Sequence, residues 1–408
     1  MKTESDLETL REVDAGLMLE WARLLVPHYG PSGAMELDLR DWPGAQGPSY
    51  YNQFAHYPLL LLAEGVVPGA SPAERAQFRE IALRNLAYTV GLADADFHTP
   101  HYSRGRDWGR HVGEWLCYYQ LCSLELIERG EIGATELRRR LRAVVSGATD
   151  HLYRVFLEKY AVTPSEFVGN HDTWHALLFY RAGRWFGRKD WTDYGRDFMQ
   201  RCVLPFQHAD GYWPEAGGIV VGYSLVTALA VSAYAELSDD AAALAAVGRA
   251  LAFAEYFSLP DGSGAVAVDV RMRYHPHPLS WLPPGFIHQA SGRRLATESI
   301  APLRRHLQAH GVRDNNAQAL AFHAGWVGRR GGGCAHALSS ASAELAAAGF
   351  HPPGFRSETG HGIHCSAAPA PAGARGAGQQ CAGPGFSRHV CRSALCAKRL
   401  PRGTGRPA

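Results

Sequence analysis

Apolar residues recur every three or four positions along most of the chain, the spacing that buries one face of an α-helix. This pattern predicts helices at residues 7–25, 51–61, 78–90, 112–126, 137–155, 172–187, 190–205, 220–237 and 239–258. The dipeptide Ser71-Pro72 is a helix-start signal before the third of these stripes. Segments rich in Gly, Pro and Asp separate the stripes, for example Pro27–Gly33, Pro43–Pro48 and Asp210–Gly218. The pattern therefore predicts an all-α body made of consecutive helical hairpins.

Helical hairpins that follow one another stack into an open solenoid or close into an α/α toroid. No short repeat of the tetratricopeptide or ankyrin kind is visible, so we expect a complete or incomplete toroid over residues 1–262. The first alternation of period two is Ala265–Arg273, which predicts a linker or the start of a truncated β domain over residues 263–328. Loops between toroid helices line a cleft at one end, where polar and aromatic residues should gather.

The last 80 residues have a different composition from the rest. Residues 329–408 contain 10 Lys and Arg against only Glu344 and Glu358, whereas residues 1–328 contain 31 Lys and Arg against 37 acidic residues. Because this tail has few large apolar residues, we expect it to be disordered. It holds five of the eight cysteines without a Cys-x-x-Cys pair, and its arginines are scattered. A Cys/His metal module, a basic nucleic-acid arm and a frameshift near Ala324–Arg330 in a GC-rich gene are the open interpretations.

Charge and hydropathy disfavour several classes of function. A net charge of +2 gives no general case for a nucleic-acid partner. No apolar run reaches the roughly 18 residues of a membrane-spanning helix. The charged segment Met1–Asp14 lacks the apolar core of a signal peptide, and Cys117, Cys122 and Cys202 resemble buried thiols of a reducing compartment. We therefore expect a cytoplasmic protein without a membrane partner.

Three clusters of polar and aromatic residues lie near expected helix junctions, at 94–114, 168–175 and 210–223. In the first, the residues expected to bind substrate are His98, His101, Tyr102, Arg104, Trp108, Arg110 and His111. Arginine binds a carboxylate through two parallel hydrogen bonds, and Trp and Tyr rings offer flat faces to a sugar ring, so the mixture suits a sugar acid. A solvated loop with Arg–Asp pairs explains the same residues equally well.

The second cluster, VGNHDTWH, has three interpretations. Asn170 can cap the helix that follows, which is its commonest role at such a position. His171 and His175 have the spacing of a zinc-binding H-E-x-x-H pair with Asp172 in place of Glu, but no third ligand follows and we expect no metal. Asn170 and His171 can instead face a substrate at the mouth of the helix.

The third cluster, DGYWPEAGGIVVGY, ends at Tyr223, which is either an ordinary amphipathic core residue or a site residue. Together with VGNHDTWHALLFYRAGRWFGRKD, the segment DGYWPEAGGIVVGYSLVTALAVSAYAEL resembles the toroid domain of alginate lyases and the wider heparinase II/III-like polysaccharide lyases. The resemblance covers residues 168–259. Such families carry a β-sandwich after the toroid, for which this sequence has no evident counterpart. They also carry an Arg before the site tyrosine, whereas Pro214–Gly222 contains none.

The resemblance implies a lyase that cleaves a uronic-acid glycoside by β-elimination. It gives Asn170, with His171 beside it, the neutralisation of the sugar carboxylate. It gives Tyr223 at least one of the acid and base roles, with His171 as the candidate for the other. Further substrate contacts are expected from Trp174, Tyr212, Trp213 and Glu215. The expected partner is an acidic poly- or oligosaccharide, with no nucleic acid and no metal or organic cofactor.

Two other functions remain open from the residues alone. An α/α-toroid glycoside hydrolase, such as an unsaturated-uronide hydrolase, would use two carboxylates as acid and base. The carboxylates available for those roles are Asp107, Glu114, Asp172, Asp210 and Glu215. A catalytically inactive, truncated sugar-binding protein is the third option. A lyase creates a double bond that absorbs ultraviolet light, a hydrolase does not, and a binding protein leaves its ligand intact.

Overall fold

The computed structural model describes residues 2–36, 53–99, 102–103, 106–107, 113–162, 168–215, 218–264, 282–310 and 320. The helices in these ranges are α1 (Lys2–Leu25), η1 (Val26–His28), α2 (His56–Ala63), α3 (Pro72–Leu92), α5 (Glu114–Arg129), α6 (Thr135–Val162), α7 (Asn170–Phe186), α8 (Lys189–Phe198), η3 (Met199–Val203), α9 (Val221–Ser238), α10 (Ala241–Tyr256), η5 (Pro284–His288) and α11 (Ala290–His310). Two short strands, β1 (Tyr102–Ser103) and β2 (Arg106–Asp107), pair antiparallel. The described part is therefore mainly helical, and the predicted all-α class is confirmed.

Helix α3 shows how local sequence sets a helix boundary. The Ser71 hydroxyl accepts a hydrogen bond from the Glu74 backbone N–H, and the Glu74 carboxylate accepts one from the Ser71 N–H. These reciprocal bonds satisfy donors that the first helical turn leaves free, and Pro72 has no N–H to satisfy. The predicted apolar stripe of this helix is buried, with Phe78 and Ile81 at most 5% exposed. The start signal and the buried face were both predicted correctly.

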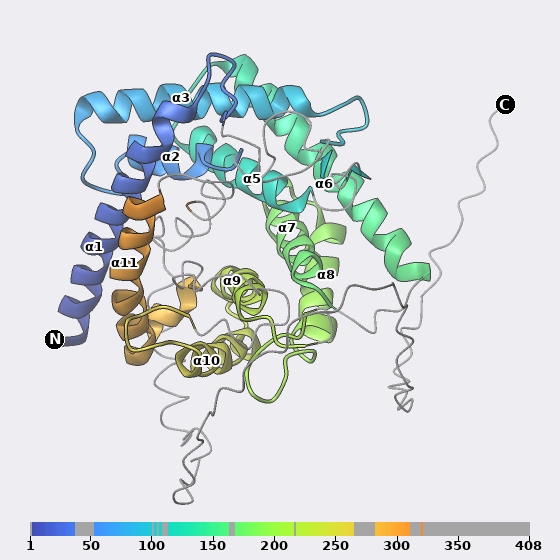
Figure 1. Ribbon diagram of the computed structural model, residues 1–408. Coiled ribbons are helices and arrows are strands. Elements are labelled where there is room, and N and C mark those ends of the chain that lie inside the picture. Colours follow the sequence, from blue (N-terminus) through green and yellow to red (C-terminus); the bar gives the residue numbers. More distant parts are fainter. Residues whose placement is uncertain are drawn as a thin grey trace, which may run out of the picture. The chain divides into compact units, whose positions relative to one another are not determined.

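Helices α5, α7 and α9 carry the candidate site and lie in the interior. Most residues of α5 and α9 are buried whichever side of the helix they occupy. Helix α7 contacts both α5 and α9, while α6, α8 and α10 pack against α5, α7 and α9 respectively (Figure 1). Helices buried on all sides are expected where an inner row is covered by an outer one.

The N-terminal helix packs against the last long helix described. Helices α1 and α11 run side by side in Figure 1, and Arg304 Nε donates to Glu20 Oε2 at 2.8 Å between them. Segment η5 contacts α9 and α10, with the Gly285 N–H donating to Ser232 Oγ at 2.6 Å. Residues 282–310 thus pack onto the helices that precede them.

The structure departs from the sequence expectations in two places. Val13 and Leu24 belong to the predicted buried stripe of α1, but each is 39% exposed. Helix α11 was not predicted, because residues 263–328 were assigned to a linker or a truncated β domain after a proline-rich segment. The contacts group Met1–Phe350 in one compact unit and His351–Ala408 in another. The expected boundaries after residues 262 and 328 stay predictions. The expected strand Ala265–Arg273 and the tail 329–408 lie outside the described residues.

Helix α9 has the length and composition of a membrane-crossing helix, whereas the sequence analysis expected none. In the structure 72% of it is buried inside the protein, which is the environment of a core helix. Its partners there are α7 and α10.

Candidate functional site

The first turn of α7 presents Asn170 and His171 together. The helix is preceded by extended Gly169, whose N–H donates to the Asp172 carboxylate at 3.0 Å. Asn170 is therefore the first helical residue, and its side chain does not cap the helix. Its amide Nδ2 lies 3.4 Å from Glu215 Oε2, as does its backbone nitrogen. The capping interpretation of Asn170 is thus wrong, and the amide faces the loop that precedes α9.

A buried carboxylate from the first turn of α5 holds His171. The Nδ1 atom of His171 lies 2.5 Å from Oε1 of Glu114, whose side chain is fully buried. The indole of Trp115 packs against the same imidazole, with ring centroids 4.6 Å apart. The His171 side chain is nevertheless 35% exposed. One edge of the ring is therefore fixed by α5, while the ring still reaches solvent.

The pKa values of the two histidines of α7 are shifted in opposite directions. Burial favours the neutral form of His171, but the Glu114 carboxylate outweighs it, with contributions from Asp172 and Glu215, and raises the pKa of His171 above its usual 6.5. Burial dominates at His175 and lowers its pKa. His175 Nδ1 lies 2.8 Å from the His171 backbone oxygen, and its Nε2 is 3.6 Å from Glu114 Oε2. Relative to a free imidazole, His171 is thus shifted toward the cation and His175 toward the neutral ring.

Tyr223 lies in the first turn of α9 and is half-buried, which fits both an amphipathic core residue and a site residue. One hydrogen bond joins α9 to α7 near their N-termini, and a second joins the first turn of α9 to the loop before it. Trp174 Nε1 donates to the Val226 backbone oxygen at 3.0 Å, and the Trp213 N–H donates to Ser224 Oγ at 3.2 Å. Val226 and Trp174 each lie about one turn inside their helices, so this bond joins the N-terminal parts of α7 and α9.

The possible zinc pair of α7 is engaged by the protein itself. His171 and His175 both face Glu114, and Asp172 is held by the Gly169 N–H and by Lys159 Nζ at 2.6 Å. Within the described ranges no three His, Cys, Asp or Glu side chains are grouped so as to hold a metal ion.

Two predicted substrate contacts are packing residues. Trp174 is 3% exposed and packs edge-on against Trp115 and Tyr118. Trp213 is 1% exposed, and its Nε1 donates to the Val203 backbone oxygen at 2.9 Å. Neither ring has a face free to stack on a sugar, so the expected substrate contacts of Trp174 and Trp213 are replaced by core packing.

Of the other predicted contacts from the third cluster, Glu215 reaches the site and Tyr212 packs elsewhere. Glu215 is half-buried and contacts Asn170, as described above. Tyr212 stacks on His208, with centroids 4.6 Å apart, and its ring also contacts Phe253 of α10. Tyr212 is therefore engaged by the α10 side of its loop.

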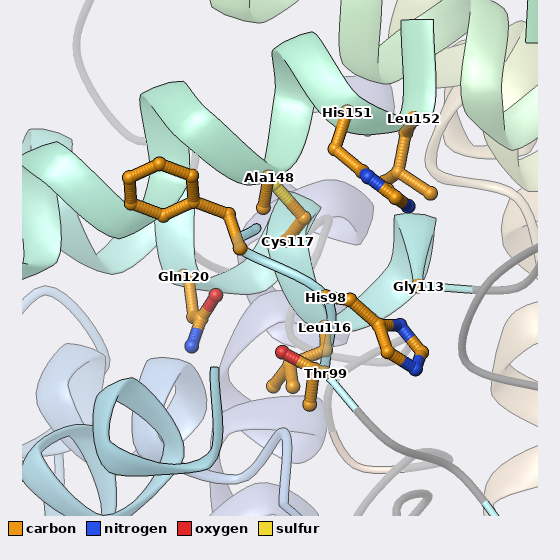
Figure 2. Close-up of a pocket in the computed structure, with 10 residues that line it drawn as sticks. His98, Thr99, Gly113, Leu116, Cys117, Gln120, Ala148, His151 and Leu152 are labelled. Carbon is orange, nitrogen blue, oxygen red and sulfur yellow. The ribbon is translucent and has the colours of Figure 1, made fainter. Parts of the chain in front are cut away.

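His98 lines a small cavity next to the start of α5. Figure 2 shows His98 and Thr99 entering from the loop after α3, with His151 from α6 and Gly113 just before Glu114. The space inside, about 10 Å³, admits a group no larger than one water molecule. The wall also contains Cys117, whose thiol pKa burial raises to about 12. The cavity is too small for a sugar ring, and its thiol stays protonated near neutral pH.

The other predicted contacts of the first cluster cannot be placed. His101, Arg104, Trp108, Arg110 and His111 lie outside the described residues. Tyr102 forms β1 opposite Asp107 of β2, which fixes its backbone only. The cationic loop expected to bind a sugar acid therefore stays a prediction.

The contact between Glu114 and His171 was not predicted. Glu114 was considered only as a hydrolase carboxylate and as part of the first cluster. The available signal was an acidic residue directly before the apolar run Trp115–Leu116, on a helix expected to be buried. A carboxylate in such a place needs a partner.

No protein-family model matches the chain, and no curated protein or solved structure is significantly similar to it. The site is therefore interpreted from its own geometry.

Proposed function

We propose that this protein is a polysaccharide lyase that cleaves a uronic-acid-containing poly- or oligosaccharide by β-elimination. The observation that carries the proposal is the first turn of α7. There the Asn170 amide and a His171 imidazole inclined to be cationic stand next to each other, at the end where α9 also begins. An amide donor next to a cationic donor suits the neutralisation of a substrate carboxylate.

The chemistry needs such a pair because an ionised carboxylate acidifies the neighbouring C5–H only weakly. As the proton leaves C5, negative charge builds on the carboxylate oxygens. Donors already aimed at those oxygens stabilise that charge by about 2.7–4 kcal/mol each. Asn170 and His171 are the donors in this proposal. Glu215, 3.4 Å from the Asn170 amide, makes a long hydrogen bond that a substrate carboxylate can replace.

Tyr223 serves as the base in this scheme. It accepts the C5 proton, the C5–H electron pair forms the C4–C5 double bond, and the C4–O4 bond breaks. The leaving O4 then receives a proton, either from the same tyrosine or from His171. A phenol has an ordinary pKa near 10, so it acts as a base only where positive charge favours the phenolate. His171 is the cation that α7 brings to the same end of the helices.

The helix contacts support an α/α toroid as the scaffold of this site. In sequence order α2, α5, α7 and α9 each contact the next, and α9 leads through η5 to α11. Helix α1 contacts both α11 and α2. Such a circuit of neighbours is what a complete or nearly complete toroid of helical hairpins requires.

The engaged carboxylates favour the lyase over a glycoside hydrolase. A hydrolase needs two carboxylates that reach the glycosidic bond. Glu114 is fully buried against His171, and Asp172 binds Lys159 and the Gly169 N–H. Asp210 is 77% exposed beside His208.

The test is incubation of the full chain with a panel of uronate polymers and oligomers. Turnover creates a C4–C5 double bond, and its ultraviolet absorbance reports the rate. Replacing Asn170→Ala should lower kcat by about 10²–10³-fold. Glu128→Gln changes an α5 carboxylate paired with Arg142, remote from the site, and serves as the matched control. Reducing-end release without absorbance would assign a hydrolase instead, and binding without turnover a sugar-binding protein.

A further inference from the structure

The position of Glu114 makes an ionised carboxylate costly in free energy unless its charge is compensated by partners. Its side chain is fully buried in the first turn of α5. Its Oε1 is bonded to His171, while its Oε2 has no hydrogen-bond partner among the described residues. Burying a charge without full compensation costs several kcal/mol, so such groups cluster at functional sites.

The geometry fixes which nitrogen of His171 carries a proton. An ionised carboxylate only accepts hydrogen bonds, so with Glu114 ionised the Nδ1 atom, 2.5 Å from Glu114 Oε1, donates. The second imidazole near Glu114 cannot share this task. His175 Nδ1 lies 2.8 Å from the His171 backbone oxygen and donates to it, and its Nε2 is beyond hydrogen-bond distance from Glu114.

The carboxylates that raise the pKa of His171 are Glu114, Asp172 and Glu215. Helix α5 contributes Glu114, and α7 itself contributes Asp172 and His175. Helix α6 contributes Lys159, which is bound to Asp172. The loop before α9 contributes Glu215, which lies 3.4 Å from the Asn170 amide. Glu114 Oε1 lies 2.5 Å from the His171 ring.

We propose that Glu114 is a positioning residue that keeps His171 protonated on both nitrogens, with Nε2–H presented to the substrate carboxylate. The proposal rests on the lyase function and assigns the donor role and the base role to different residues. A doubly protonated imidazole donates and cannot accept, so His171 is not the base that removes the C5 proton. That role falls to Tyr223.

The test measures His171 directly, whether or not the chain turns over a polymer. Histidine labelled with nitrogen-15 reports the protonation of each ring nitrogen by NMR, and His171→Asn identifies the signal. In the unaltered chain at neutral pH, both nitrogens of His171 should be protonated. In Glu114→Gln, which keeps the size and an acceptor oxygen but removes the charge, His171 should titrate at lower pH. Glu128→Gln should leave the titration in place.

Glu114→Asp separates positioning by charge from simple packing. It keeps the charge on a shorter side chain, so the doubly protonated His171 should be retained at neutral pH. If Glu114 acted only through packing, Glu114→Gln, which keeps the side-chain size, would leave His171 unchanged, and Glu114→Asp would not. For a chain that turns over a uronate polymer, Glu114→Gln should lower kcat at neutral pH by about 10²–10³-fold. The alkaline limb of its pH profile should also move to lower pH.

Several results would overturn the assignment. One is that, in the unaltered chain at neutral pH, His171 is neutral or carries no proton on Nδ1. This measurement does not depend on any variant folding correctly. Another is an unchanged His171 titration in Glu114→Gln. Absence of turnover with every polymer would instead refute the lyase proposal while the NMR result still decides the role of Glu114.

Discussion

Helices α5 and α7 are joined by two ion pairs, each with a buried carboxylate, that differ in their cation. At one end, Glu114 faces His171; three turns further along α5, Glu125 faces Arg181. The Arg181 guanidinium binds both carboxylate oxygens of Glu125, at 2.7 and 3.0 Å, and also donates to the Tyr118 hydroxyl at 2.9 Å. Every oxygen of that carboxylate is satisfied, whereas Glu114 leaves one oxygen bare.

The difference separates a structural pair from a functional one. Arginine stays charged at any pH a cell reaches, so the Glu125 pair is a fixed clamp. Histidine titrates, its charge depends on Glu114, and its ring is more exposed than the Arg181 side chain, at 35% against 16%. Helices α5 and α7 thus hold one ion pair that stays charged at cellular pH, Glu125–Arg181. Near their N-termini they hold a second pair, Glu114–His171, whose charge depends on pH.

The largest effect should follow from changing the functional end. Tyr223→Phe removes only a hydroxyl, so we expect turnover of a uronate polymer to fall by about 10²–10⁴-fold with the circular dichroism spectrum unchanged. Tyr256→Phe is the matched control, because that tyrosine is 83% exposed on α10. Full activity in Tyr223→Phe would remove this residue from the reaction.

Breaking the structural pair should instead cost stability. Arg181→Met leaves the buried Glu125 carboxylate with only the 3.5 Å contact to the exposed Arg129, which should lower the free energy of unfolding by about 3–5 kcal/mol. Urea denaturation measures the loss. The double variant Arg181→Met with Glu125→Leu should recover much of it, and a double variant no more stable than the single one would contradict this explanation.

A histidine with no carboxylate partner provides the opposite pH dependence. His56 of α2 is fully buried with its Nδ1 2.8 Å from Ser123 Oγ, and burial lowers its pKa from 6.5 to about 3. Below pH 6.5 the unfolded chain takes up a proton that the folded chain does not, so stability falls as the pH falls. The loss is at most about 1.4 kcal/mol per pH unit.

His56→Gln should therefore flatten the acid side of the stability profile between pH 6.5 and 4, measured by urea denaturation. His171, whose pKa is raised, contributes stability that is present below pH 6.5 and lost as the pH rises through its folded pKa. An acid slope equally steep in His56→Gln would assign it to other groups.

The smallest effect should come from the ion pair between the exposed Lys159 and the buried Asp172, near the start of α7. Lys159 is 53% exposed, and its partner Asp172 also accepts from the Gly169 N–H. Lys159→Gln should therefore change the free energy of unfolding by less than about 1 kcal/mol. A loss as large as that of Arg181→Met would mean that exposure does not distinguish these pairs.

Local sequence was enough for much of the fold. The Ser71-Pro72 signal and the stripe from Phe78 to Val90 predicted α3 and its buried face, because capping and periodicity act over a few residues. Asn170 and His171 were recognised as neighbours at a helix start for the same reason. Helix α11 was missed because residues 263–328 were assigned to a linker or a truncated β domain after a proline-rich segment.

The contacts that define the site were beyond local sequence. Glu114 and His171 are separated by 57 residues, and no pattern links them until α5 and α7 pack together. The indoles of Trp174 and Trp213 fit a sugar platform and a core equally well on composition. Burial decided between those interpretations, and burial depends on all neighbouring helices at once.

The pairing of α1 with α11 has a consequence for synthesis. Glu20 and Arg304 are 284 positions apart. At about 5–20 residues per second, a ribosome needs roughly a quarter of a minute to one minute to make the segment between them. During that interval part of the apolar side of α1 has no cover, and the nascent chain is a natural client for chaperones that shield hydrophobic helices.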